Sequence, residues 1–373
     1  MNNYIIAGID LHDNMMVVRV AKNTEKSVRL TYRNTRAGRG ALVRDLKARA
    51  SDAGEALIVA AYEASSQGFG LYDDLMECGI VCHVFAPTEM ERSARAADSK
   101  NDDRDAEQIL GILRAHLLAG NSLPSIWVPD KETRDDREIV RARLDAASKL
   151  TAIKAQVQTL LKRNSVREPA DTLTRWTKKY RAWLAGLTGG ATPLAFGARN
   201  VLKSLLRQLE FLEDEIERLD SLVETLSAMA RYALAADELM KQKGVGLLTA
   251  MVFLTEMGDL SRFKNRKDVG SYLGLAPTCH ESGEANDRKG HITHRGPHRV
   301  RKVLCQAVWA RVRHDKKETE RYDKQVARNP KHKKIAVVAA MRRLAVILWH
   351  KGLEAQQRAG VFQREAEALP CMS

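Results

Sequence analysis

The sequence predicts an α/β domain with a mixed five-stranded sheet, followed by a coiled-coil hairpin and a mainly helical C-terminal domain. Three observations predict this order. Short apolar runs separated by turn residues alternate with helical patterns in the first part of the chain. The middle part carries a leucine repeat with heptad spacing. The last part is basic, and glycine-containing turns interrupt its helical periodicity.

The first three apolar runs, 5–9, 15–20 and 28–32, have the length of strands rather than of helices. Asp13-Asn14 and Asn23-Thr24 separate them, and both pairs favour tight turns. Because short turns connect antiparallel neighbours, we expect these runs to form an antiparallel meander.

Two βα units are expected after the meander. A helix over 38–50 leads to a strand at 57–61, and a second helix around Leu71 and Leu75 leads to a strand at 81–85. Helical crossovers allow the following strands to run parallel. A meander followed by βα units matches the mixed sheet of the ribonuclease H and RuvC-like nucleases, although fold alone does not fix function.

Four carboxylates lie where these elements end or begin. Asp10 closes the first strand, and Glu63 follows the strand at 57–61. Asp102 and Asp105 open a helix on which they share one face, with Asp98 as a rival on the same stripe. Carboxylates are the ligands that Mg²⁺ and Mn²⁺ prefer, and two such ions about 4 Å apart bind the attacking and leaving oxygens of a phosphodiester. Each acid alone also fits helix capping or solvation.

Composition narrows the class of protein. The chain has 373 residues, enough for about two or three domains. No segment has the pattern of a signal peptide or membrane span, and five cysteines without a Cys-x-x-Cys pair fit a reducing cytoplasm. The net charge is +14, and residues 288–343 hold 18 Lys and Arg against 4 Asp and Glu. Such a block is typical of nucleic-acid binding, with a solvated surface or a patch for acidic proteins as the alternatives.

The middle of the chain predicts a coiled coil. Leucine, isoleucine and valine recur at spacings of three and four from Leu202 to Leu226, and an earlier helix from Ile139 to Leu160 has a compatible register. The two helices are expected to pair as an antiparallel hairpin whose tip lies in 165–200. Such a hairpin serves either as a spacer or as a subunit interface. We expect an N-terminal domain over 1–125, the hairpin over 126–235, a C-terminal domain over 236–360 and a tail over 361–373.

The C-terminal part begins with a glycine-containing turn. Gly244-Val245-Gly246 precedes an apolar helix over 247–257 and resembles a helix-hairpin-helix, in which amides at a helix N-terminus meet phosphate. It also fits an ordinary tight turn. The basic residues that follow are candidate phosphate contacts, since arginine and lysine bind phosphate oxygens. Together with the two glycines, the candidate nucleic-acid contacts are Gly244, Gly246, Lys289, Arg295, Arg299, Arg301 and Lys302.

The motifs together resemble those of the insertion-sequence-110 transposases, relatives of the Piv DNA invertases. The resemblance is specific because it follows the family's order from Gly8 to Arg301. Its motifs are Gly8-Ile9-Asp10, Glu63-Ala64-Ser65, the segment 100–106, Gly244-Val245-Gly246, the segments 256–263 and 272–277, Ser282-Gly283, Arg295-Gly296 and the segment 299–301.

The resemblance implies an activity, a cofactor and partners. Family members are DNA recombinases in which the four acids bind Mg²⁺ or Mn²⁺ and a serine of the C-terminal domain forms a phosphoserine link; here that serine is Ser282. It also implies double-stranded donor and target DNA, a structured guide (bridge) RNA in some members, and homodimers that join into tetramers. The expected location is the bacterial cytoplasm, at the nucleoid when DNA is bound.

Other assignments compete with these. Ser282-Gly283 also fits a turn, and a hydroxyl needs a base, a metal or an electropositive site to act as a nucleophile. Tyr272 is a less favoured nucleophile because it lies in an apolar stretch. Zinc is disfavoured because the spacing of the set matches no common finger; the set is Cys279, His280, His291, His294 and His298.

The sequence departs from the family pattern twice. His12-Asp13 stands where relatives usually have a lysine, and Lys100-Asn101-Asp102 replaces Lys-Thr-Asp. Neither change removes a carboxylate, but Asp13 lies close enough in sequence to perturb the metal site. Two other functions remain open: a RuvC-like junction nuclease that uses water, and a non-catalytic helix-hairpin-helix DNA-binding protein.

Overall fold

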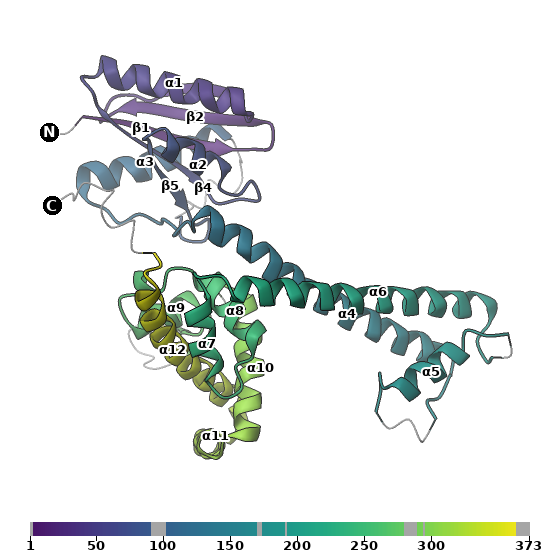
Figure 1. The fold of residues 1–373 in the computed structure, drawn as a ribbon. Coiled ribbons are helices and arrows are strands. Elements are labelled where there is room, and N and C mark those ends of the chain that lie inside the picture. Colours follow the sequence, from purple (N-terminus) through teal and green to yellow (C-terminus); the bar gives the residue numbers. More distant parts are fainter. Residues whose placement is uncertain are drawn as a thin grey trace. The chain divides into compact units, whose positions relative to one another are not determined.

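A computed structural model describes residues 3–90, 102–169, 174–190, 192–279, 289–293 and 295–362 (Figure 1). The chain forms two compact units, Met1–Val128 and Pro129–Ser373. The finer division predicted at residues 125, 235 and 360 remains a prediction. Within the described ranges, every helix is too short or too polar to cross a membrane.

The first unit is built on the mixed five-stranded sheet that the sequence predicts. Its order is β3-β2-β1-β4-β5, with β1, β2 and β3 antiparallel and β4 and β5 parallel to β1. Short turns join the antiparallel strands, whereas helices connect the parallel ones, as the geometry of the two ladders requires. The strands are β1 (Tyr4–Leu11), β2 (Met15–Lys22), β3 (Val28–Arg33), β4 (Leu57–Glu63) and β5 (Val81–Phe85).

Helices cover both faces of this sheet. Odd-numbered residues of β1, such as Ile5 and Ile9, pack in one core with α1 (Arg36–Asp52) and α2 (Gly70–Glu77). Even-numbered residues, such as Tyr4 and Ile6, pack in the other core with α3 (Asp102–Ala119). Because side chains alternate between faces along a strand, Asp10 lies on the face that α3 covers.

The second unit begins with two long helices that pack antiparallel. Early residues of α4 (Lys131–Arg163) contact late residues of α6 (Phe196–Ser227): Arg143 Nε lies 2.7 Å from Asp220 Oδ1. Later in α4, Val157 shares a core with Leu202 near the start of α6. The apolar seam of this hairpin is therefore packed within the chain at both ends. A short helix, α5 (Lys178–Gly186), lies in the tip segment, for which the sequence predicted no helix.

The rest of the second unit is mainly helical. Its largest core surrounds α8, in which every residue from Ala250 to Met257 is buried, and α12 contributes Leu344 and Leu348. The elements are α7 (Ala233–Met240), α8 (Leu247–Met257), η1 (Leu260–Arg262), α9 (Arg266–Tyr272), β6 (Pro277–Cys279), β7 (Lys289–Ile292), α10 (His298–His314), α11 (Lys316–Arg328), η2 (Pro330–His332) and α12 (Lys333–Ala359).

Candidate functional site

Gly8 brings α3 directly over the end of β1. A Cβ atom at this position would lie 2.2 Å from the carbonyl oxygen of Ala106 and 2.4 Å from the backbone nitrogen of Leu110. Only glycine allows the helix backbone to approach the strand so closely. The first turn of α3 is therefore held beside Asp10, which lies two residues further along the same face of β1.

The first turn of α3 carries three aspartates, and they divide into two groups. Acids are favoured at a helix N-terminus because they face the positive end of the helix dipole. Asp103 pairs with Arg19 of β2, whose Nε donates to Oδ1 at 2.6 Å; this hydrogen bond lowers the pKa of Asp103. Asp102 lies on the other side of the turn, toward Asp10 and His12. Arg19 thus anchors the helix without using the acids that face the strand.

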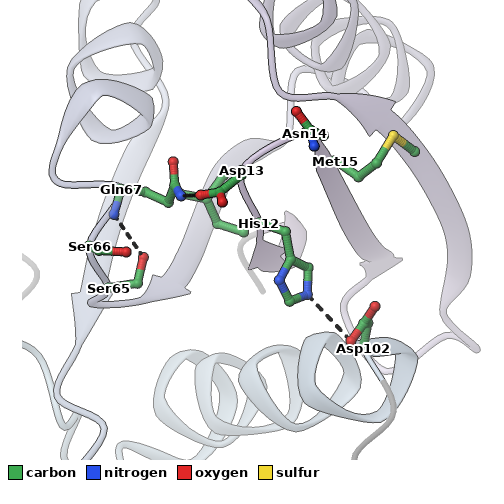
Figure 2. A pocket seen from close by; sticks show the side chains of 9 residues that line it. His12, Asp13, Asn14, Met15, Ser65, Ser66, Gln67 and Asp102 are labelled. Carbon is green, nitrogen blue, oxygen red and sulfur yellow. Dashed lines mark hydrogen bonds and ion pairs between the residues drawn. The ribbon is translucent and has the colours of Figure 1, made fainter.

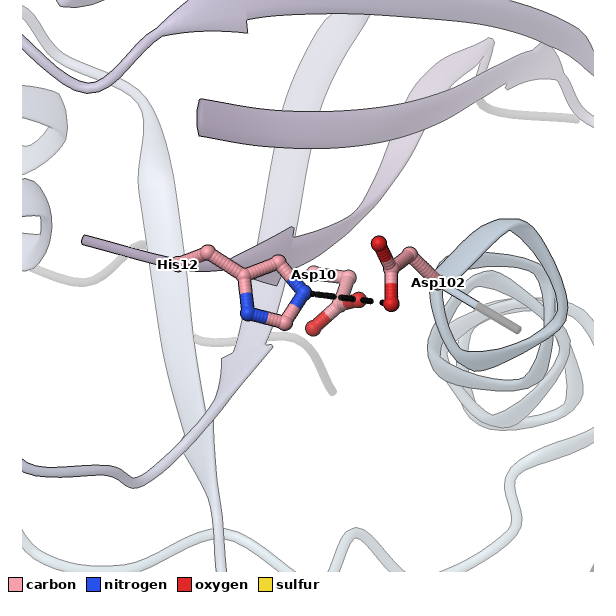
Figure 3. A group of neighbouring side chains, drawn as sticks. All are labelled: Asp10, His12 and Asp102. Atoms are coloured by element: carbon pink, nitrogen blue, oxygen red, sulfur yellow. Dashed lines mark hydrogen bonds and ion pairs between the residues drawn. The ribbon is translucent and has the colours of Figure 1, made fainter. Parts of the chain in front are cut away.

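Asp10, His12 and Asp102 form a compact group of possible metal ligands (Figure 3). His12 Nε2 lies 2.9 Å from Asp10 Oδ2 and 3.3 Å from Asp102 Oδ1. One ligand atom from each residue lies within 4.8 Å of the other two. Two elements and the turn after β1 therefore direct three donor atoms to one point.

The charge on Asp10 is unfavourable in the metal-free fold. Burial raises the pKa of Asp10; His12 opposes this shift, and the negative charges of Asp102 and Asp105 add to it. A raised pKa means that the folded state favours the neutral carboxyl, so ionisation near neutral pH destabilises the fold. A bound cation would remove this penalty. Asp105 is thus near enough to Asp10 for its negative charge to raise the pKa of Asp10.

Glu63 lies on the neighbouring strand at the same level as Asp10. The parallel register pairs Ile9 with Tyr62, so the next residues along the two strands, Asp10 and Glu63, are side by side. Val59 and Ala61, on the same face of β4 as Glu63, belong to the core under α3. Glu63 and Asp105 nevertheless lie outside the compact group of three. The structure thus places all four predicted acids at one end of the sheet and brings two of them, with His12, into ligand distance.

A polar cleft of about 490 Å³ opens beside this group (Figure 2). Two loops form it: the turn after β1, and the segment Ser65–Gln67 after β4. The side-chain amide of Gln67 donates to Asp13, which joins the two loops. Asp13 therefore contacts Gln67, while His12 contacts the acids. Asp102 and His12 line the same cleft, so a polar molecule in the cleft can reach the Asp102 carboxylate.

His12 is the residue that sequence reasoning underestimated. In the sequence it stands out only as a departure from the family pattern, yet the structure places its imidazole between two predicted ligands. One feature of the sequence could have indicated this role: His12 follows Asp10 by two residues at the end of a strand, where the chain turns back.

Ser282 lies outside the described residues, as do Asp98, Lys100 and Asn101. The strands on either side of its segment, β6 and β7, are described and pair antiparallel. Lys289 begins β7, but its side chain is also outside the described set. At the base of this hairpin, the backbones around Gly274 and Gly296 cross closely. A Cβ on Gly296 would lie 1.8 Å from the carbonyl oxygen of Tyr272, and the two glycines have φ of +63° and +74°. Both positions require glycine.

Several predicted phosphate contacts are hydrogen-bonded within the protein. Arg301 Nη1 donates to the carbonyls of Leu273, Arg295 and Gly296 at 3.0, 2.9 and 3.2 Å. These bonds hold the crossing segments together. Arg299 and Lys302 contact residues of α4: Arg299 Nη2 lies 3.3 Å from Asp145, and Lys302 Nζ lies 3.0 Å from Ser148 Oγ.

The glycines of the predicted helix-hairpin-helix have different roles. Gly244 has φ of +79°, and a Cβ there would lie 2.6 Å from the carbonyl oxygen of Ala307, so close packing on α10 requires glycine. Gly246 is exposed and caps α8 with an extended backbone. The phosphate contact expected at the N-terminus of α8 remains a prediction.

Tyr272, the competing nucleophile, has a described position. The Tyr272 hydroxyl donates to the carbonyl of Glu256 at 3.3 Å, and its ring packs on Phe263 and Arg262, as expected of a core residue. The side chains of Cys279, His280 and His294 lie outside the described set. Among the described residues, the one group with metal-ligand spacing is that of Asp10, His12 and Asp102.

Comparison with known proteins covers both units. Residues 7–165 match a transposase family model of the DEDD type, and residues 236–323 match the model described as transposase IS116/IS110/IS902 family. A putative transposase, y4qE of Sinorhizobium fredii, is 30% identical over 289 residues, which is 76% of this chain and 64% of that protein.

Two further relatives have informative names. The transposase for insertion sequence element IS1111A of Coxiella burnetii is 25% identical over 251 residues, covering 67% of this chain and 65% of that protein. The pilin gene-inverting protein of Moraxella bovis is 30% identical over 104 residues, covering 28% of this chain and 32% of that protein. The chain thus spans just under two thirds of y4qE and of the IS1111A transposase.

Proposed function

This chain belongs to the IS110 family of transposases, and we propose that it is the recombinase of an insertion sequence, which cuts and rejoins DNA through a metal-assisted phosphoserine intermediate. The observation that carries the proposal is the gathering of Asp10, Asp102, Asp105 and Glu63 at one end of the sheet in the region that matches the family.

The proposed metal site fits the residues present. Asp10, Glu63, Asp102 and Asp105 would hold Mg²⁺ or Mn²⁺, because their oxygens are hard donors and the repulsion at Asp10 favours a cation. When bound, the metal supplies Lewis-acid stabilisation of charge on phosphodiester oxygens. The carboxylates position it, and the adjoining polar cleft gives access to a DNA strand.

Ser282 is the proposed nucleophile. Its Oγ forms a bond to phosphorus as the bond from phosphorus to one DNA oxygen breaks. The serine proton leaves for a base, and the departing DNA oxygen takes up a proton. The products are a phosphoserine linkage and a free DNA hydroxyl. In the rejoining step, a hydroxyl of the partner strand attacks the phosphoserine and releases Oγ, which takes up a proton. Because the number of phosphoester bonds is unchanged, no ATP is needed.

The proposed partners are nucleic acids and further copies of the chain. The basic block 288–343 supports binding of double-stranded donor and target DNA. The likeness to a gene-inverting protein supports site-specific recombination. We further propose a structured bridge RNA as guide and a homodimer that assembles into a tetramer, both on the strength of family membership.

The covalent intermediate provides the test. Wild-type protein is incubated with end-labelled DNA carrying the element's ends, and adducts are resolved in denaturing gels. Ser282→Ala should remove the adduct and retain DNA binding, while Ser271→Ala, an exposed serine of α9, serves as the matched control.

Three results would contradict this proposal. An adduct of wild-type strength in Ser282→Ala would rule out Ser282 as the nucleophile. Cleavage by the wild type without any adduct would favour the junction nuclease that uses water. DNA binding by the wild type without cleavage or rejoining, unchanged when the acids are neutralised, would favour the DNA-binding protein without catalysis.

A further inference from the structure

We infer that His12 is a direct metal ligand in the site of Asp10 and Asp102, and that its imidazole makes this site bind Mn²⁺ in preference to Mg²⁺. This inference rests on the proposed function, because it concerns the same metal centre. It adds a nitrogen donor to a set that is otherwise made of carboxylates.

The distances fit ligands of one ion. Metal–ligand distances of about 2.1 Å in an octahedral sphere place neighbouring ligand atoms about 3.0 Å apart. The separations from His12 Nε2 are 2.9 Å to Asp10 Oδ2 and 3.3 Å to Asp102 Oδ1. Both distances are close to the separation of adjacent ligand atoms in such a coordination sphere. A small displacement of the three side chains therefore suffices to admit the ion at their centre.

The backbone fixes His12 in this position. Its N–H donates to the carbonyl of Met15 at 2.9 Å, which closes the turn after β1. Its carbonyl accepts a hydrogen bond from Asn34 Nδ2 at 2.8 Å. The turn is therefore held on both sides, and the side chain folds back across the end of the strand toward α3 (Figure 3). A ligand held in this way loses little conformational entropy when an ion binds.

The basic side chains described nearby do not neutralise Asp10 and Asp102. The nearby arginines are paired elsewhere: Arg19 and Arg29 both contact Asp103. Among the described residues, neither Asp10 nor Asp102 forms an ion pair with lysine or arginine, and His12 is their shared partner. A single imidazole nitrogen does not neutralise two carboxylates. A divalent ion between them does so, and the Nε2 lone pair then completes its inner sphere.

The donor chemistry sets the metal preference. Mg²⁺ prefers oxygen ligands and loses its water reluctantly. First-row transition ions accept imidazole nitrogen more readily than Mg²⁺ does. Mn²⁺ is the weakest of them in this respect, but it shares with Mg²⁺ a preference for carboxylates. Replacement of the imidazole should therefore weaken Mn²⁺ binding more than Mg²⁺ binding.

Pulsed electron paramagnetic resonance of Mn²⁺ bound to the full-length protein tests this ligation without any turnover. Electron spin echo modulation reports a directly coordinated nitrogen. Wild-type protein should show the nitrogen signal, and His12→Ala and His12→Gln should lose it, while His116→Ala, a histidine at the other end of α3, retains it. Titration should show Mn²⁺ affinity falling by about tenfold or more in both His12 variants, with a smaller change for Mg²⁺.

The outcomes separate this inference from the proposed function. Bound Mn²⁺ without a nitrogen signal in the wild type would overturn the role of His12 and leave the carboxylate site standing. Equal or tighter binding of both ions in His12→Ala would show that His12 competes with the metal, which also overturns the inference. Wild-type Mn²⁺ affinity in Asp10→Asn, by contrast, would overturn the metal site of the proposed function itself.

Discussion

Asp10 shows at the scale of one residue how function and stability oppose each other. Its pKa is raised by burial and by the nearby acids, so the charged form that a metal needs destabilises the empty fold. Asp10→Asn keeps the size of the side chain and removes the charge. We expect the melting temperature of metal-free protein to rise by a few degrees, while the increase that Mn²⁺ gives the wild type disappears.

Thermal unfolding with and without Mn²⁺ measures both effects. Asp52→Asn, an exposed acid at the end of α1, is the control and should behave like the wild type. A lower melting temperature for metal-free Asp10→Asn would show that the charge on Asp10 stabilises the fold, contrary to this account.

The candidate site was predictable in part at this scale. Asp10 and Glu63 end apolar runs, and Asp102 and Asp105 share a helical spacing, so each is visible in the sequence. The positions of His12 and Arg301 were not, because both depend on tertiary contacts. Arg301 holds carbonyls up to 28 positions away, and no sequence pattern distinguishes it from a phosphate-binding arginine.

At the scale of elements, the contact between β1 and α3 is the feature on which the site depends. Gly8→Ala places a methyl group against the backbone of α3, 2.2 Å from the Ala106 carbonyl oxygen. The helix must move outward, which separates Asp102 and Asp105 from Asp10. We expect this variant to lose Mn²⁺ binding although all four acids remain. Calorimetric titration with Mn²⁺ measures the loss.

A second glycine-to-alanine change provides the matched control. Gly111 lies within α3, and a Cβ there meets no atom within 4 Å. Because alanine favours a helix over glycine by about 0.5–1 kcal/mol, Gly111→Ala should bind Mn²⁺ normally and be slightly more stable. Normal Mn²⁺ affinity in Gly8→Ala would refute the idea that this close approach builds the site.

A buried ion pair connects the helical hairpin to the core of the second unit. Arg141 donates from Nε and Nη2 to the two carboxylate oxygens of Glu256 at 2.7 and 2.9 Å. Burial alone would raise the pKa of Glu256, but Arg141 and Arg137 outweigh it and lower this pKa. Because the pKa is lowered, ionised Glu256 stabilises the fold at pH values above the ordinary carboxyl pKa of about 4.3. This stability is lost as the pH falls through the pKa of the folded state.

Glu256→Gln should therefore destabilise the second unit by about 3 kcal/mol near pH 7, because it leaves a half-buried guanidinium without its counter-charge. The difference from wild type should shrink as the pH is lowered. Urea denaturation at several pH values measures it. Glu215→Gln removes an exposed i,i+3 pair with Arg218 and should change nothing measurable. A pH-independent difference for Glu256→Gln would contradict the electrostatic explanation.

Most elements were predictable because their residues carry a local period. The short continuous apolar run of β1, the turn residues before β2 and β3, and the heptads of α6 each specify an element without tertiary information. The helix over 247–257 coincides with α8. In contrast, α5 has nine residues among glycines and prolines, and β6 and β7 have three and four residues, so their patterns are too short to detect.

At the scale of the whole molecule, we expect the position of the positive charge to govern binding to nucleic acid. The net charge of +14 is matched by the excess of basic residues in 288–343. Lys331, Lys333 and Lys334 are exposed there. If they contact phosphates, replacing all three by alanine should reduce the slope of log affinity against log salt by about 2.7, at about 0.9 for each contact. Fluorescence anisotropy with duplex DNA measures the slope.

The control for this experiment removes the same charge elsewhere. Lys47, Lys162 and Lys203 are exposed and lie outside the basic block. Their combined replacement by alanine should leave the salt slope near that of the wild type. Equal slopes for the two triple variants would mean that net charge, rather than its location, determines DNA affinity.

The central claim is that β1, its following turn, β4 and α3 bring carboxylates together to bind a divalent ion. Anomalous diffraction from crystals grown with Mn²⁺ tests it most directly, since it locates the ion without requiring a DNA substrate. We expect a strong peak within bonding distance, about 2.1–2.3 Å, of oxygens from Asp10 and Asp102. Crystals with Mn²⁺ bound elsewhere, and no peak between these two aspartates at saturating metal, would contradict it.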